Sequence, residues 1–299
     1  MKRLIPAFLF LLAGAAQSAE TASYLDIGVG ARGLAMGGAY TALADDAHSV
    51  YWNPAGLARL EKREVAASHS ELGNSTRHDF MVYAHPTSQA VLAAGITYLN
   101  QGRIAGRDAT GRPTGGYDAS DAALAFAAGR KLELIDVGVS VKYLRSHIAS
   151  TEAQGLAMDA GLKRELSAGS GKVVLGAALR NIGPGLKYDN QRNDLPLRAA
   201  FGAAYRFAAG HALAAELQNG PRGAGSEGGA GGEFKAHEGV FLRLGYTSKS
   251  ASVAGSGFDA ARGLTLGLGL KKDGFSLDYA AQAAGELGST HRFTLSSRF

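Results

Sequence analysis

Residues 27–60 read IGVGARGLAMGGAYTALADDAHSVYWNPAGLARL and never settle into a period-two alternation. The stretch is dense in glycine, carries an acidic pair at Asp45 and Asp46, and closes on Asn53 and Pro54. Most of the sequence after it alternates apolar residues with small or polar ones, which is the pattern of β-strands with two different faces. The stretch therefore divides the chain into a short non-strand segment and a long strand-rich region.

The strand-rich region contains fourteen candidate strands. The clearest is residues 264–270, LTLGLGL, in which every second residue is leucine. Segments of this length, with one apolar face and one polar or small face, are typical of membrane-spanning barrel strands. The candidates are residues 64–70, 78–85, 91–99, 119–129, 135–147, 154–165, 172–182, 197–207, 211–218, 228–237, 240–248, 262–271, 275–283 and 290–299.

The connections between these candidates are predicted to alternate in length without exception. Tight turns at residues 86–88, 208–210 and 272–274 fall between longer connections at residues 100–118, 183–196 and 249–261. Short turns at one end and long loops at the other are typical of outer-membrane barrels, whose termini both lie at the turn end, in the periplasm. We therefore expect an all-β fold, a 14-stranded antiparallel transmembrane β-barrel with a short N-terminal helical plug.

The side-chain parity along the candidate strands supports a membrane barrel. Aromatic residues with outward parity lie near both strand ends, as in the interfacial girdles of such barrels. They are Tyr98, Tyr143 and Tyr246 toward the loops, and Phe207, Phe275 and Phe299 toward the turns. A charge facing lipid near the midplane costs about 2–4 kcal/mol, so charged residues should face the lumen. Inward parity collects Lys142, Asp159, Lys163, Arg180, Arg198, Arg206, Glu216, Arg243, Asp278 and Arg292.

Composition sets further limits. Residues 1–19 have a basic start, an apolar run and small residues at the end, which predicts a cleaved secretory signal peptide. The chain has no cysteine, and beyond residue 20 no apolar run approaches the ~18 residues of a transmembrane helix. The net charge of +5 comes from scattered side chains, which does not indicate a nucleic-acid surface. We divide the chain into the signal peptide at 1–19, a plug segment at 20–62 and the barrel at 63–299.

Several local motifs have competing interpretations. Asp45 and Asp46 lack further ligands for a metal site, so we expect an aspartate here to cap a short helix that Asn53 ends and Pro54 follows with a new turn. The Gly28-Val29-Gly30-Ala31-Arg32-Gly33 pattern matches a dinucleotide fingerprint but lacks the acidic residue and the βαβ context. A hydrolase site would have to use His69, Ser70, His78 and Asp79, which are otherwise a polar strand end. We predict no enzyme activity, no metal and no cofactor.

The stretch at residues 27–60 resembles the N-terminal segment of the FadL-like outer-membrane barrels, and most closely the PorV/PorQ family. The resemblance is carried by Gly30-Ala31-Arg32-Gly33, Met36-Gly37-Gly38-Ala39, Ala44-Asp45-Asp46-Ala47 and Tyr51-Trp52-Asn53-Pro54-Ala55-Gly56-Leu57, and extends to residues 175–184, 277–279, 285–288 and 290–293. It implies a helical plug at the periplasmic side. The plug or gate residues would be Gly37, Gly38, Asp45, Asp46, Trp52, Asn53, Pro54 and Gly56.

Two functions remain open at this stage. The resemblance implies either a passive channel for hydrophobic or amphipathic small molecules, or an accessory barrel of a type IX-like protein-secretion machinery. Both place the chain in the outer membrane of a Gram-negative cell, in contact with outer-membrane lipid. The terminal Phe299 resembles the signal by which the barrel-assembly machinery recognises its substrates.

Overall fold

The computed structural model describes residues 20–73, 75–222, 225–248, 262–283 and 289–299. Four short helices come first: η1 (Ser23–Asp26), α1 (Ala31–Ala35), α2 (Ser49–Trp52) and η2 (Pro54–Arg59). Sixteen strands follow: β1 (Glu64–Glu71), β2 (Arg77–Pro86), β3 (Val91–Arg107), β4 (Pro113–Lys131), β5 (Asp136–Ile148), β6 (Thr151–Ala168), β7 (Gly171–Ile182), β8 (Leu186–Tyr188), β9 (Gln191–Asn193), β10 (Arg198–Arg206), β11 (Ala212–Gly220), β12 (Gly225–His237), β13 (Val240–Thr247), β14 (Leu264–Lys272), β15 (Phe275–Ala283) and β16 (Ser289–Arg298).

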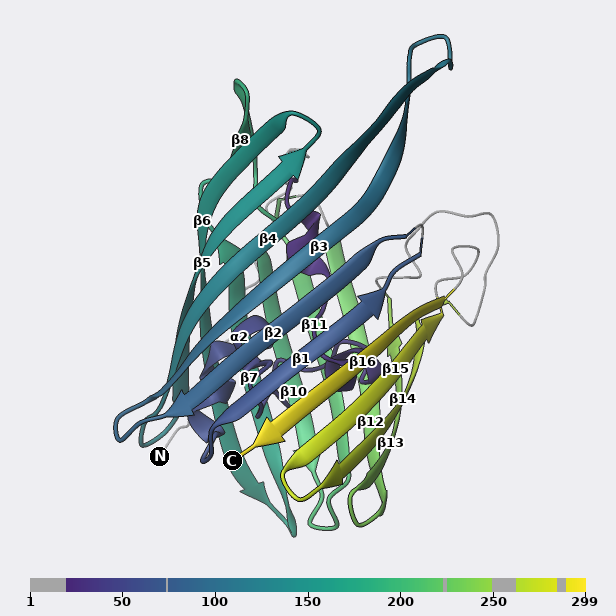
Figure 1. Ribbon diagram of the computed structural model, residues 1–299. Helices are drawn as coiled ribbons and strands as arrows, with labels where there is room; N and C mark the ends of the chain where they lie inside the picture. The colour runs from purple at the N-terminus through teal and green to yellow at the C-terminus, as the bar shows by residue number, and fades with distance from the viewer. Residues whose placement is uncertain (1–19, 74, 223–224, 249–261, 284–288) are drawn as a thin grey trace.

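Fourteen of these strands form a closed antiparallel barrel, which confirms the predicted all-β, 14-stranded architecture (Figure 1). Each strand pairs with its neighbours along the chain, and β1 closes the ring by pairing with β16 from Glu64↔Arg298 to Glu71↔His291. Closure satisfies the backbone hydrogen bonds of every barrel strand on both sides and removes the free sheet edge. The two remaining strands, β8 and β9, pair with each other in the connection between β7 and β10.

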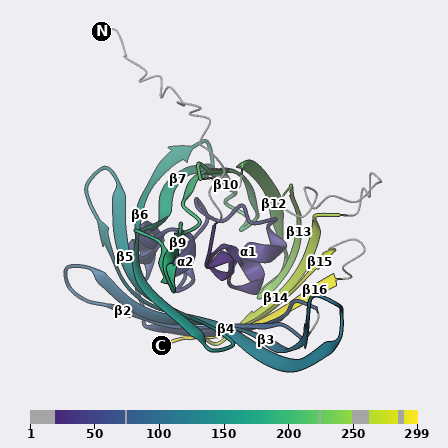
Figure 2. The same cartoon turned by 90° about the horizontal axis from the view of Figure 1, so that it is seen from above.

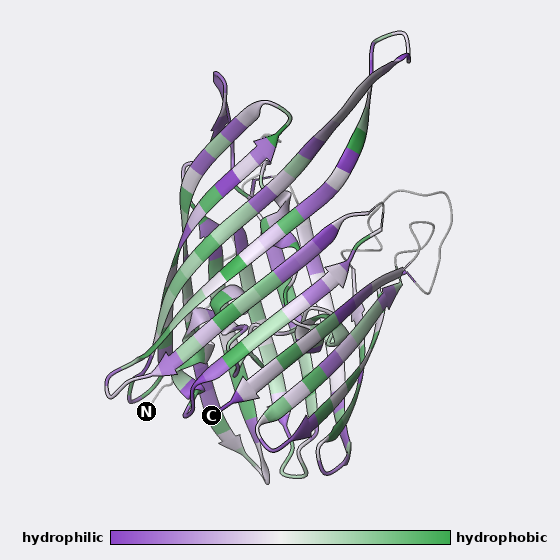
Figure 3. Cartoon of the chain, in the orientation of Figure 1, coloured by the Kyte–Doolittle hydropathy of each residue, from purple (hydrophilic) through white to green (hydrophobic). Residues whose placement is uncertain are grey.

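The outer face of the barrel is apolar. Hydrophobic and hydrophilic residues alternate along many of the strands (Figure 3). Phe126, Leu217 and Leu295 are 59%, 70% and 58% exposed, whereas a water-soluble protein would bury most side chains of this kind. The six predicted girdle aromatics are all exposed on this face: Tyr98, Tyr143, Tyr246, Phe207, Phe275 and Phe299. Among the described residues, no helix is long and apolar enough to cross a membrane. An apolar outer wall with aromatic residues near the strand ends fits a barrel surrounded by lipid.

The loop predicted at residues 100–118 is wrong. Most of it is strand, because β3 and β4 continue past the barrel rim and form a projecting hairpin (Figure 1). The ladder breaks between Asn100 and Arg103, where Gly102 has a φ of 65°, and then resumes from Arg103↔Asp118. A second register shift lies near the tip of the hairpin, between Gly106 and Arg107. The hydrogen bonds between paired strands also form in water. Because the bulge restores the register of β3 and β4, the two strands can stay paired beyond the barrel rim.

The strict alternation of connection lengths is also wrong. At the loop end, β5 and β6 are joined only by Ala149 and Ser150, because both strands are long. The predicted connection at residues 249–261, the signal peptide at residues 1–19 and the motif at residues 285–288 lie outside the described residues.

The predicted position of the C-terminus at the turn end is confirmed, whereas the first described residue lies at the opposite end of the barrel. Phe299 lies at the turn end, where its amide donates to the carbonyl of Arg63 at 3.0 Å. Glu20, the first described residue, bridges Asp194 in the connection between β9 and β10, which lies at the loop end. The N-terminal segment therefore enters the lumen from the loop end and travels toward the turn end before β1 begins.

Candidate functional site

The N-terminal segment, residues 20–62, lies inside the barrel (Figure 2). Most of its apolar side chains are buried, and Tyr24, Tyr40, Leu43 and Leu57 are each at most 1% exposed. The segment follows the inner wall: α1 packs against β13, β14, β15 and β16, and η2 packs against β3, β4, β5 and β6. The lumen is therefore filled largely by the chain's own first residues.

Asn53 and Pro54 shape the middle of this segment as the sequence predicts. Helix α2 ends at Trp52, Asn53 is extended, and Pro54 begins η2. The Asn53 side chain accepts a hydrogen bond from the Ala55 amide at 3.1 Å. Its amide nitrogen donates to the carbonyls of Thr41 and of Leu162 in β6, at 2.9 and 3.1 Å. One side chain thus caps a helix, braces the segment and ties it to the wall.

Trp52 explains the glycines at the start of the segment. Its indole nitrogen donates to the carbonyl of Val29 at 2.9 Å. A Cβ added at Gly28 would lie 2.9 Å from the Trp52 ring, and one added at Gly33 would lie 3.0 Å from it. These glycines therefore give the ring room against the backbone, and the dinucleotide interpretation has no structural basis.

A row of glycines on the barrel wall, Gly129, Gly138 and Gly161, receives η2 and the residues before it. They lie opposite one another on β4, β5 and β6. A Cβ at Gly138 would lie 2.1 Å from the carbonyl carbon of Pro54, and one at Gly161 would lie 2.0 Å from Asn53 Oδ1. This glycine row lets the segment's backbone approach the wall without a side chain between them.

The other predicted glycines of the segment also mark close approaches. Gly37 has a φ of 66°, and a Cβ there would lie 2.3 Å from the carbonyl oxygen of Tyr246 in β13. Gly38 has a φ of 78°, a backbone conformation that glycine adopts readily. A Cβ at Gly56 would lie 2.4 Å from the carbonyl oxygen of Ala44. The structure places these residues at tight points, and their gating role remains a prediction.

Ion pairs join the segment to the wall at the turn end of the lumen. Arg32 contacts Glu233 of β12 at 2.8 Å and Asp45 at 2.7 Å, and Asp45 also contacts Arg206 of β10 at 3.0 Å. Burial alone would raise the pKa of Asp45, but Arg32 and Arg206 outweigh it and lower this pKa to about 2. Asp45 is therefore a charged anchor. Arg32, Asp45 and Glu233 border a cavity of about 170 Å³, the turn-side cavity.

The helix-capping role predicted for the acidic pair is wrong, because the N-cap of α2 is His48 and this cap has no side-chain hydrogen bond. The Asp46 side chain instead accepts from the His48 amide at 3.0 Å, one residue before the helix begins. His48 Nδ1 lies 3.4 Å from the same carboxylate, and its Nε2 lies 3.2 Å from Ser68 Oγ on β1. Burial would lower the pKa of His48, but Asp46 outweighs burial and raises it, helped by Glu64 and Asp278. The charged imidazolium is thus favoured where the segment meets β1.

The ten charges predicted to face the lumen are all buried or partly buried on the inner side of the wall: Lys142, Asp159, Lys163, Arg180, Arg198, Arg206, Glu216, Arg243, Asp278 and Arg292. Most of them have clear partners. Lys142 and Asp159 pair at 2.7 Å, next to a register break between β6 and β7. Arg243 contacts Glu233 at 2.7 Å and Asp278 at 2.6 Å.

Two further charges of this set hold the segment directly. The carboxylate of Glu216 accepts the amides of Tyr40 at 2.9 Å and Thr41 at 2.8 Å. Arg198 pairs with Glu20 at 2.9 Å and also with Asp26. The segment is therefore fixed by wall charges near its start as well as in its middle.

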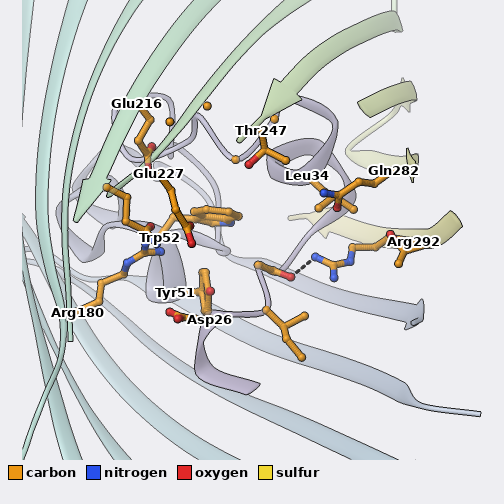
Figure 4. Close-up of a pocket in the computed structure, with 18 of the residues that line it drawn as sticks. Asp26, Leu34, Tyr51, Trp52, Arg180, Glu216, Glu227, Thr247, Gln282 and Arg292 are labelled. Atoms are coloured by element: carbon orange, nitrogen blue, oxygen red, sulfur yellow. Dashed lines mark hydrogen bonds between the residues drawn. The ribbon is translucent and has the colours of Figure 1, made fainter. Parts of the chain in front are cut away.

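The last two charges, Arg180 and Arg292, border a larger cavity on the other side of the segment (Figure 4). This loop-side cavity measures about 310 Å³ and is bordered near the strand ends by residues such as Leu72 and Thr247. Figure 4 shows Trp52 and Tyr51 on one side of it and Arg292 on the other. The full lining is Asp26, Ile27, Gly28, Leu34, Gly37, Gly38, Tyr51, Trp52, Leu72, Arg180, Glu216, Gln218, Glu227, Gly228, Gly229, Thr247, Gln282, Thr290 and Arg292.

The cluster considered for a hydrolase does not assemble. His69 and Asp79 hydrogen-bond at 2.6 Å on the outer face, whereas Ser70 and His78 are each 1% exposed on the inner face. The alternation of the strands therefore separates the four side chains. The described residues also contain no group of three or more His, Cys, Asp or Glu side chains that could hold a metal ion.

Two anchors escaped the sequence reasoning. Glu233 joins Arg32 and Arg243, and Asp136 receives Arg59. Glu233 has inward parity, which was a usable signal. Lys163, which was predicted to face the lumen, donates to the carbonyl of Ala44. Most partners of these three residues lie far away in the sequence, so parity could not identify the pairs.

Residues 15–198, more than half of the 299, match the sequence profile described as "Uncharacterised protein family (UPF0164)". The chain belongs to this family. No curated protein matches this UPF0164 chain in sequence.

Solved structures resemble the UPF0164 barrel closely in fold. The Ralstonia pickettii toluene transporter TbuX has a TM-score of 0.65 and 14% identity, covering 91% of this chain and 98% of the transporter. The P. putida toluene transporter TodX has a TM-score of 0.61 and 11% identity, covering 91% and 99%. A Pseudomonas aeruginosa FadL homologue has a TM-score of 0.54 and 11% identity, covering 95% and 99%. The fold is thus a FadL-like barrel, and the finer PorV/PorQ resemblance is not confirmed.

Proposed function

We propose that this barrel is an outer-membrane channel for hydrophobic or amphipathic small molecules, with residues 20–62 as its plug. The observation that carries the proposal is a lumen filled by the N-terminal segment, with a cavity of about 310 Å³ left at the loop end. The similar folds of two toluene transporters and of a FadL homologue support it.

The plug gives the channel its selectivity. A fourteen-stranded barrel lies between the small barrels that side chains fill and the 16–18-stranded porins with an open aqueous channel. The segment occupies this intermediate lumen and is held by the Arg32–Glu233 and Asp45–Arg206 pairs and by the glycine row. Bulk water and ions are excluded, while the loop-side cavity can hold a small ligand.

The location follows from the same proposal. The apolar outer wall lies in outer-membrane lipid, and the signal peptide at residues 1–19 directs export through the inner membrane. Phe299 has an exposed side chain on the outer face at the turn end, where the barrel-assembly machinery would read it. A secretion-accessory role depends on the finer PorV/PorQ resemblance, and no observation favours it over transport.

Uptake into intact cells tests the function, because a lipopolysaccharide leaflet excludes hydrophobic dyes that phospholipid alone would pass. Cells with the channel should take up a neutral naphthylamine dye faster than cells without it. Leu34→Trp, which fills the loop-side cavity, should abolish the gain. Leu268→Trp should preserve it, because Leu268 is exposed on the outer face. Equal uptake with and without the channel would refute the proposal.

A further inference from the structure

We propose that the loop-side cavity binds a compact organic anion, a carboxylate on a single ring or short chain, with its charge facing Arg292 and Arg180. The inference rests on the proposed channel function and adds the class of ligand. It starts from a contrast between the charges at the two ends of the lumen.

At the turn end the arginines are ion-paired. Arg32 and Arg243 share Glu233, Arg206 contacts Asp45 and Glu165, and Arg298 contacts Glu64 at 2.9 Å. Buried charges in proteins are normally compensated in this way, because an isolated ion loses its hydration without replacement. The turn-side cavity therefore needs no ligand to balance its charge.

Arg292, which lines the loop-side cavity, is a buried charge without an ion-pair partner among the described residues. It is 2% exposed and donates to Ser70 Oγ and to the carbonyl of Gly28, both of which are neutral. Within the described part of the chain, no carboxylate lies within 4.0 Å of its guanidinium. Figure 4 shows the side chain pointing across the cavity toward the Gly28 carbonyl. A buried cation with only neutral partners, on the wall of a cavity, indicates that the counter-ion is the ligand.

Arg180 repeats the pattern on the opposite wall. It is 4% exposed, donates to the side-chain oxygen of Gln218, and lies over the rings of Tyr51 and Trp52 at 5.4 and 5.6 Å. Its Nε and Nη1 have no hydrogen-bond acceptor among the described residues. Three carboxylates also line the cavity, those of Asp26, Glu216 and Glu227. Asp26 is paired with Arg198, and Glu216 is engaged by the Tyr40 and Thr41 amides. Among the described residues, none of the three forms an ion pair with Arg180 or Arg292 within 4.0 Å.

The other residues that line the cavity indicate the polarity and the size of the uncharged part of the ligand. Ile27, Leu34, Leu72 and Trp52 offer apolar surface beside the two arginines. A volume of about 310 Å³ is at the lower end of small-molecule pockets, which suits one ring or a short chain rather than a long lipid tail. A pure hydrocarbon would remove water from the arginines and glutamines without replacing its hydrogen bonds, so a neutral ligand should bind this cavity more weakly than an anion of the same size.

Trp52 provides the test, because it is the only tryptophan in the chain and lines the cavity. Purified barrel in detergent is titrated with benzoate, toluene and hexadecanoate at constant ionic strength while Trp52 emission is recorded. Benzoate should give a saturable change. Arg292→Gln and, separately, Arg180→Gln should weaken it on the order of 30-fold or more, the loss expected when one partner of a buried charge pair is removed. Faster gel migration before boiling establishes that each variant is folded.

Arg145→Gln is the matched control, because it removes a loop-end arginine that is 55% exposed and paired with Glu152 outside the cavity. It should leave benzoate binding at the wild-type value. If toluene binds as tightly as benzoate, and if neither cavity arginine affects its binding, the proposal that the ligand is an anion is wrong. The proposed channel function would still stand. If hexadecanoate binds as tightly as benzoate, the ligand is not limited to a single ring or a short chain. If benzoate causes no change in Trp52 emission, the proposed binding site is wrong. The dye-uptake assay tests the proposed channel function independently of this result.

Discussion

Replacing Gly138 with alanine tests whether the glycine row holds the segment against the wall. The added Cβ would lie 2.1 Å from the carbonyl carbon of Pro54 and 2.3 Å from the amide nitrogen of Ala55. Both are backbone atoms, which cannot rotate away as a side chain can. To restore an ordinary contact of 3.4 Å, the segment must recede by roughly 1.3 Å, the difference between 3.4 and 2.1 Å.

The expected cost follows from overpacking. Inserting a methyl group into a filled interior costs about 1–3 kcal/mol when the surroundings must shift. Because every 1.4 kcal/mol changes an equilibrium constant tenfold, a cost of about 2 kcal/mol weakens docking of the segment by about 30-fold. Gly228→Ala is the matched control, since a Cβ there would meet only Leu217 Cδ2 at 3.7 Å and the Glu216 carbonyl oxygen at 3.8 Å. It should leave docking nearly unchanged.

Urea titration followed by Trp52 emission measures the effect, because the single tryptophan lies in the segment and reports its docking. Gel mobility reports the barrel separately. Gly138→Ala should lower the urea midpoint of the Trp52 transition while the barrel remains folded. Equal midpoints for Gly138→Ala and Gly228→Ala would refute the close packing of segment and wall described here.

Three further predictions concern the barrel, its insertion and its pH response. The protein should migrate faster unboiled than boiled in detergent gels, because a closed barrel has no free edge from which to unfold, and identical mobility would count against closure. Deleting Phe299 should lower the folded fraction in the outer membrane more than Arg298→Ala does, because Phe299 is 61% exposed on the outer face while Arg298 faces Glu64. Equal losses of folded protein in the two variants would contradict this prediction. The pKa of His48 is raised by Asp46, so its stabilising charge is fully present below the ordinary histidine pKa of about 6.5 and is lost as pH rises through the higher folded value. The urea midpoint of Trp52 should therefore fall with rising pH in the wild type and not in His48→Asn, and an equal fall in both would exclude His48 as the cause.

The barrel was predictable because its strands carry local signals. Alternation located all fourteen barrel strands, and parity put residues such as Lys142 and Phe275 on their correct faces. The extension of β3 and β4 beyond the rim was missed, because a hairpin in water has no apolar face to mark it. The position of Glu20 at the loop end was missed because it depends on contacts with Asp194 and Arg198, which are distant in the sequence.

The candidate site was predictable only in part. The break at Asn53 and Pro54 follows from local backbone chemistry, and the structure has it where the sequence places it. The pairing of Arg32 with Glu233 and the absence of an acidic partner for Arg292 among the described residues depend on the path of the segment through the lumen. Inward parity identifies a lumenal charge, but only the folded path decides which charges meet.

The central claim is that residues 20–62 close the lumen of a membrane barrel, and single-channel recording of a variant lacking residues 22–60 tests it most directly. The barrel should still insert, because its strands bond to one another and β1 closes on β16 without the segment. Once the segment is gone, the lumenal charges would line a wet pore, so the variant should conduct small ions while the parent stays closed. A deletion variant as closed as the parent would contradict the account, because the lumen would then be sealed by something other than its N-terminal segment.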